Sequence, residues 1–139
     1  MKSTPVLLFV ILIAISLSGC QSYGKEYKLD KKHNVYYKGE GLTEDIAKKL
    51  ANYLKEQEYF QDSIESTVQI TRNKDTFNLN FVVNASKLTE STGNNFLIFG
   101  AFISEKVFNK APVTIHLTND HLETVKNLGY AKPLGDPDK

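Results

Sequence analysis

The clearest structural signal in this chain is a regular alternation of apolar and polar residues between positions 66 and 84. The segment reads STVQITRNKDTFNLNFVVN, and RNKD supplies turn-forming residues between two alternating runs. A period of two sends successive side chains to opposite faces of a strand. We therefore predict a β-hairpin with one apolar face and one polar, uncharged face. Its apolar positions are Val68, Ile70, Phe77, Leu79, Phe81 and Val83.

The segment before the hairpin changes to a helical period. In LTEDIAKKLANYLKEQEYF, four apolar residues follow the spacing i, i+4, i+7, i+8, which places them on one helical face. They are Ile46, Leu50, Tyr53 and Leu54. Thr43 can cap this helix, and the acidic residues that follow suit the positive end of its dipole. We predict an amphipathic helix whose lysines face solvent.

A second helix is predicted after the hairpin, over residues 95–109 of the apolar run FLIFGAFISEKVFN. Asn95 could cap it and Asn109 could end it. Gly100 weakens the helix but would let it approach a sheet closely. We expect a buried helix; the alternative is an exposed aromatic patch that faces a partner or a lipid surface.

Two further strands complete the predicted order. We expect strands at about 34–38, in NVYYK, and around Val113–Leu117, in PVTIHL. Residues 122–130 fit a short helix or a returning strand. The order is therefore β-α-β-β-α-β, and the predicted fold class is α+β. The expected architecture is a ferredoxin-like split β-α-β-β-α-β with an antiparallel sheet and two helices on one face.

The N-terminus carries a different kind of signal. Residues 1–19 contain Lys2, a short apolar run and then small residues, which is the order of a secretory signal peptide. The run is too short for a typical membrane span, although a retained anchor is the alternative. Leu17, Ser18, Gly19 and Cys20 resemble the lipobox of bacterial lipoproteins. That resemblance implies cleavage between Gly19 and Cys20 and lipidation of Cys20.

The resulting organisation has four parts. Residues 1–19 would be a cleaved signal, 20–33 the lipidated cysteine and a tether, 34–130 an α+β domain, and 131–139 a disordered tail. The only cysteine would then be used for lipid, so no disulfide is expected. Two or more acyl chains suffice for stable anchoring. We expect a protein held on the extracytoplasmic side of the cell membrane or outer membrane.

Composition and motifs argue against most catalytic classes. The chain has 17 basic and 16 acidic residues, a balance that gives no reason to expect nucleic-acid binding. We find no phosphate-binding glycine loop and no G-x-S-x-G motif, and no cofactor is expected. His116, Asp120 and His121 in HLTNDH could suggest a metal-assisted hydrolase. A strand followed by a turn would not bring the three together, so we expect no metal site.

One predicted surface is more suggestive than these motifs. The polar sides of the expected strands share the sheet face away from the helices. That face is uncharged and contains an aromatic residue, so it could dock a partner or simply meet water. Its expected members are Tyr36, Gln69, Asn78, Asn80, Thr114 and His116.

The middle of the chain resembles a little-characterised bacterial domain that stands alone in lipoproteins or is joined to rhomboid-like membrane proteins. The resemblance rests on VYYKG, on a helix ending in YF, on FVVN and on PVTIHLTND. It implies a discrete domain and no catalytic residue. One alternative that follows from it is an accessory or regulator of an intramembrane protease.

These observations favour a membrane-anchored lipoprotein of the cell envelope with a non-enzymatic binding or accessory domain. Its contacts would be the membrane, through the lipid on Cys20, and an envelope protein as yet unidentified.

Overall fold

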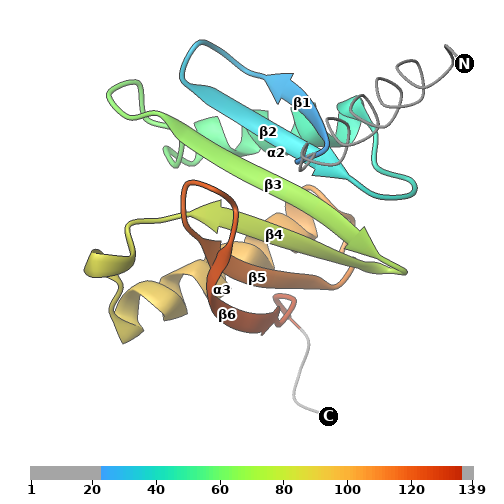
Figure 1. Cartoon of the computed structure of the whole chain (residues 1–139). Helices are drawn as coiled ribbons and strands as arrows, with labels where there is room; N and C mark the ends of the chain where they lie inside the picture. Colours follow the sequence, from blue (N-terminus) through green and yellow to red (C-terminus); the bar gives the residue numbers. More distant parts are fainter. Residues whose placement is uncertain (1–22, 136–139) are drawn as a thin grey trace, which may run out of the picture.

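The computed structural model describes residues 23–135. The predicted signal, Cys20 and residues 136–139 of the predicted tail lie outside the described residues. Figure 1 shows a single twisted sheet with both helices behind it. The strands are β1 (Lys25–Lys28), β2 (His33–Lys38), β3 (Ser66–Asn73), β4 (Thr76–Val82), β5 (Val113–Thr118) and β6 (Thr124–Ala131). The helices are α2 (Glu44–Glu56), α3 (Glu90–Lys106) and a short 3-10 turn, η1 (Ala85–Lys87).

The strands lie side by side in the order of the sequence, β1-β2-β3-β4-β5-β6. Each helix connects two neighbouring parallel strands: α2 joins β2 to β3, and α3 joins β4 to β5. The other three pairs are antiparallel. The prediction of a ferredoxin-like antiparallel sheet is therefore wrong, because the sheet is mixed and has six strands.

The error has a physical reason. A strand-helix-strand unit buries the same alternating residues whether its second strand lies next to the first or one position away. Hydrophobic period therefore gives the order of elements along the chain without giving the order of strands in the sheet. The two edge strands were also weak signals, since β1 is short and β6 has Ala131 as its one buried residue.

The predicted hairpin is confirmed as β3 and β4, which pair antiparallel around the turn residues Lys74 and Asp75. The predicted strand at 34–38 is β2, which begins one residue earlier. Residues 122–130, left open between helix and strand, supply most of β6. β1 lies within the predicted tether, around Tyr27, and β6 runs to Ala131.

Helix α2 forms as its sequence indicates. The Thr43 side chain accepts a hydrogen bond from the Ile46 amide, which satisfies one of the free donors of the first turn. Leu50 and Leu54 are fully buried against the sheet, whereas the predicted solvent-facing lysines are exposed.

Helix α3 begins earlier than predicted. Thr89, rather than Asn95, is its N-cap and accepts a hydrogen bond from the Thr92 amide. The helix ends at Lys106, with Val107 as C-cap. The first turns contain polar residues and Gly93 but no large apolar side chain, so hydrophobic period could not detect them. One side of α3 is buried, and Ile98 and Phe102 remain 56% and 40% exposed on the helix surface.

Gly100 explains how closely α3 packs on the sheet. A Cβ built at this position would lie 2.6 Å from Ile115 Cδ1 and 2.9 Å from Ala131 Cβ. The helix therefore rests on β5 and β6 at a distance that only glycine permits. The hydrophobic core lies between the helices and the sheet. On the sheet side it is formed by residues of β2 to β5 that face the helices, such as Val35, Ile70 and Leu79.

Candidate functional site

The candidate site is the face of the sheet opposite the helices, here called the open face. Both helices pack on the side that carries the buried residues Val35, Ile70, Leu79 and Ile115. Within residues 23–135, no helix lies over the other side (Figure 1). Because side chains alternate along a strand, the residues between these core positions point to the open face.

The strand register brings the predicted surface residues together. Tyr36 pairs with Gln69, Gln69 with Asn80, and Asn80 with His116, so these residues form one row across four strands. We call this the polar row. Asn78 lies in the adjacent row, between Thr71 and Thr114. All six residues predicted for this surface thus share one face; their role in binding stays a prediction.

Hydrogen bonds between neighbouring strands hold much of the open face in a fixed arrangement. Asn80 Nδ2 donates to Gln69 Oε1 over 2.7 Å, and Gln69 Nε2 donates to the Tyr23 carbonyl over 2.9 Å. In the adjacent row, Thr114 Oγ1 donates to Asn78 Oδ1, and Asn78 Nδ2 donates to Thr71 Oγ1.

A third chain of hydrogen bonds runs from Thr67 to Asn34 and on to Glu26. Such cross-strand pairs are each worth ~0.2–1 kcal/mol and fix side-chain orientation. The open face is therefore a preorganised polar surface.

His116 completes the polar row on β5. Its side chain is half-buried, and burial lowers its pKa below the usual value. The imidazole is accordingly neutral near pH 7. The polar row carries no formal charge at that pH.

The chain enters the described region across this face. Tyr23 packs edge-on against Tyr36, with ring centroids 5.7 Å apart, and its carbonyl accepts the Gln69 hydrogen bond. Tyr23, the first described residue, thus contacts two members of the polar row.

The suggested metal ligands do not converge. His116 lies on β5, whereas Asp120 and His121 lie in the exposed turn between β5 and β6. His121 Nε2 is 3.7 Å from Asp120 Oδ1, and both side chains are mostly exposed. In the part of the chain that the structure describes, no three potential ligands gather into a metal site.

Sequence reasoning missed a buried histidine at the start of β2. His33 is 2% exposed and stacks on Phe60, with ring centroids 4.8 Å apart. Nδ1 lies 2.7 Å from Asp30 Oδ2, and Nε2 lies 2.9 Å from the carbonyl oxygens of Gln61 and Ile64. Of these contacts, the sequence could have indicated only the one with Asp30, because its carboxylate lies three positions before His33.

These contacts change the protonation of His33. Burial by itself lowers the pKa of the ring, but the hydrogen bonds to Asp30 and to the two carbonyls outweigh burial and raise that pKa. The same interaction lowers the pKa of Asp30. When protonated, the ring donates from both nitrogens and joins the β1–β2 turn to the connection that follows α2.

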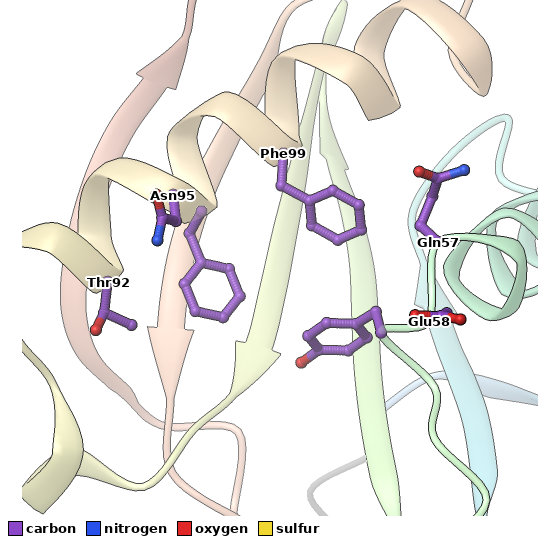
Figure 2. Close-up of a pocket in the computed structure, with 7 residues that line it drawn as sticks. Gln57, Glu58, Thr92, Asn95 and Phe99 are labelled. Carbon is purple, nitrogen blue, oxygen red and sulfur yellow. The ribbon is translucent and has the colours of Figure 1, made fainter.

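Sequence reasoning also missed a pocket in the helix layer. It has a volume of about 280 Å³ and lies between the end of α2 and the first half of α3 (Figure 2). Its walls are Gln57, Glu58, Tyr59, Thr92, Asn95, Phe96 and Phe99. The signal was present in the aromatic residues at YF and FLIF, but their convergence depends on tertiary packing.

Comparison with protein families gives one match, to the AF_1994_N family N-terminal domain, over residues 27–129. The chain belongs to this family. The match runs from the second half of β1 through most of β6 and so agrees with the discrete domain that the sequence predicted. The comparisons with curated proteins and with solved structures give no match. Neither helix in residues 23–135 is long and apolar enough to cross a membrane.

Proposed function

We propose that this protein is a lipid-anchored module of the cell envelope, whose family domain binds an envelope protein through the open face of the sheet. The observation that carries the proposal is the polar row Tyr36, Gln69, Asn80 and His116, which is in register across four strands and over which no helix of residues 23–135 lies. The module acts by binding and needs no catalytic residue.

The chemistry of the open face supports this role. Amides, hydroxyls and a neutral imidazole offer donors and acceptors at fixed positions, and Tyr36 adds an aromatic surface. Protein interfaces that form and dissociate are about as polar as the rest of a protein surface and are enriched in tyrosine. Because the side chains are already oriented by cross-strand hydrogen bonds, a partner would bind them with little loss of conformational entropy.

The anchor is supported by LSGC at positions 17–20 after a signal-like apolar run. Tyr23 follows Cys20 by three positions, a distance of at most ~10 Å in an extended chain. Tyr23 itself contacts Tyr36 and Gln69. A lipid on Cys20 would therefore hold the polar row close to the membrane surface, where a membrane-bound partner can reach it.

The hydrolase alternative has no geometric support, because His116 and the exposed pair Asp120 and His121 do not surround a common point. The resemblance to domains beside rhomboid-like proteins makes an intramembrane protease one candidate partner, and the experiments below do not depend on that choice.

The anchor is tested by metabolic labelling with palmitate and by fractionation of cells. Wild type is expected to carry label and to sediment with membranes, whereas Cys20→Ala loses the label. Gln21→Ala, a change at the next position, should keep it. Label retained on Cys20→Ala would contradict the anchoring proposal.

The binding face is tested by the size of the complex in detergent-solubilised native membranes. His116→Lys adds a charge to the polar row and is expected to shift the protein to the size of a monomer. Asn52→Lys adds the same charge on the exposed side of α2 and should leave the complex intact. Melting temperatures of both variants establish that they are folded. A complex that survives His116→Lys in the folded protein would contradict the proposal.

A further inference from the structure

The pocket in the helix layer has walls from two elements that are far apart in the sequence. Figure 2 shows Gln57 and Glu58 on one side, just after α2, facing Thr92, Asn95 and Phe99 on α3. Its volume of about 280 Å³ is far larger than the ~30 Å³ that one water occupies. The pocket can therefore hold a small organic group.

Three aromatic rings form its floor and one wall. Tyr59 lies 5.9 Å from Phe99 and 6.4 Å from Phe96 between ring centroids, with interplanar angles of 31° and 74°. The rings are therefore arranged at different angles around a shared space rather than stacked flat. Phe81 of the sheet supports them from below, with its centroid 5.3 Å from that of Tyr59. An aromatic ring that offers its face to a group in the pocket presents the negative side of its quadrupole.

The charge of the pocket has one sign. Of the seven described residues that line it, Glu58 alone carries a formal charge at neutral pH. Burial raises the pKa of Tyr59 far above its usual value, so its hydroxyl stays neutral. The pocket lies between the C-terminal end of α2 and the first turns of α3, so the two helix dipoles oppose one another there and the Glu58 carboxylate is the charge that remains.

The backbone at Glu58 adds an independent observation. Glu58 has φ +59°, in the left-handed region, where glycine is the usual residue after a helix end. The amides of Glu58, Tyr59 and Phe60 bond back to carbonyls of Leu54 and Lys55 and fix this turn. A non-glycine residue is strained in this conformation, so the carboxylate stands beside the pocket at a cost in stability.

We propose that this pocket binds a small organic cation, an alkylammonium group that packs against the Tyr59, Phe96 and Phe99 rings and pairs with the Glu58 carboxylate. Alkylated cations satisfy both halves of the site, because their methyl or methylene groups fill apolar space while their charge is attracted by the π faces and by Glu58. A bare metal ion would leave most of the volume empty.

The inference stands apart from the proposed function. The pocket opens in the helix layer, whereas the polar row lies on the other side of the sheet. A protein without palmitate label or without the native complex could still bind the cation in this pocket. Conversely, a protein that does not bind the cation could still be lipidated and form the complex.

The test is an NMR titration of the purified full-length chain, in non-ionic detergent, with choline and with 3,3-dimethyl-1-butanol. The second compound has the same shape as choline but carries no charge. Choline is expected to bind with a Kd on the order of 1 mM, and the neutral compound at least ~5-fold more weakly. Equal binding of the two, or no binding of choline, would overturn the proposal.

Variants of Glu58 separate the site from the fold. Glu58→Gln should weaken choline binding ~5-fold or more, and Glu56→Gln, an exposed acid that does not line the pocket, should leave it unchanged. Glu58→Gly should abolish the charge-dependent part of binding while raising Tm by several degrees, because glycine relieves the backbone strain. Choline affinity that is unchanged in both Glu58 variants would refute the role of this carboxylate.

Discussion

His33 joins two loops that lie far apart in the sequence. Its ring stands at the start of β2, contacts Asp30 in the β1–β2 turn, and reaches the Gln61 and Ile64 carbonyls after α2. The same connection carries Tyr59 and Phe60, and Phe60 stacks on the histidine ring. The position of Tyr59 in the pocket wall is therefore linked to the His33 hydrogen bonds through Phe60.

The protonated ring is expected to stabilise the fold in a defined pH range. Because the pKa of His33 is raised in the folded state, its contribution is complete below the unfolded pKa of ~6.5 and is lost as the pH rises through the folded pKa. We predict that Asp30→Asn lowers the pKa of His33, measured by NMR titration of the ring.

The same variant should reduce stability toward urea more at pH 5.5 than at pH 8.5. Asp62→Asn, an exposed acid in the connection that His33 contacts, serves as the control and should show no such dependence. A His33 pKa that is the same in Asp30→Asn and wild type would contradict the assigned role of the carboxylate.

For individual residues, the sequence predicts only contacts with partners a few positions away. Thr43 was recognised as a helix cap because its partner is three residues away. His33 was not recognised, because its carbonyl partners lie 28 and 31 positions further along the chain. Long-range hydrogen bonds to backbone leave no residue pattern that a single sequence can reveal.

Among the elements, α3 and the strands beneath it show how one residue sets a packing distance. Gly100 lies over β5 and β6, and any larger side chain would overlap Ile115 and Ala131. The sequence suggested this role, because a glycine in an otherwise apolar helix costs helix stability unless close packing requires it.

We predict that Gly100→Ala lowers the free energy of unfolding by ~1–2 kcal/mol. Overpacking costs ~1–3 kcal/mol, and the better helix propensity of alanine offsets at most ~1 kcal/mol of it. Gly93→Ala is the matched control in the same helix, where the new methyl would lie 3.3 Å from a terminal methyl of the Leu128 side chain rather than overlap it. Urea denaturation of both variants measures the difference. A Gly100→Ala protein as stable as wild type would show that α3 is free to move away from the sheet.

The elements themselves were largely predictable, and their boundaries less so. α2, β3, β4 and β5 have strong periodic patterns, and each was found in its expected place. The start of α3 was missed because residues 90–95 are polar apart from Gly93 and so show no hydrophobic period. The short β1 pairs only with β2 and contributes one core-facing residue, Tyr27.

At the scale of the whole molecule, the strand order decides which residues share a surface. Consecutive strands place Tyr36, Gln69, Asn80 and His116 next to one another in one row, which an interleaved order would separate. The predicted surface residues were right as a set because alternation alone assigns them to the polar face. Their order in the sheet required the topology, which the pattern does not contain.

The two faces of the sheet have different chemistry. The helix side holds the core and the aromatic pocket, and the open face is polar, hydrogen-bonded and contacted by Tyr23. An anchor at Cys20 would keep this second face near the membrane. The open face is therefore the surface that we propose for binding a partner.

Site-specific photo-crosslinking in native membranes tests this claim most directly. A photoreactive residue at position 116 or 80, in the polar row, is expected to give a discrete adduct, and one at position 52, on the exposed side of α2, is expected to give none. An adduct formed from position 52 and absent from positions 80 and 116 would contradict the account.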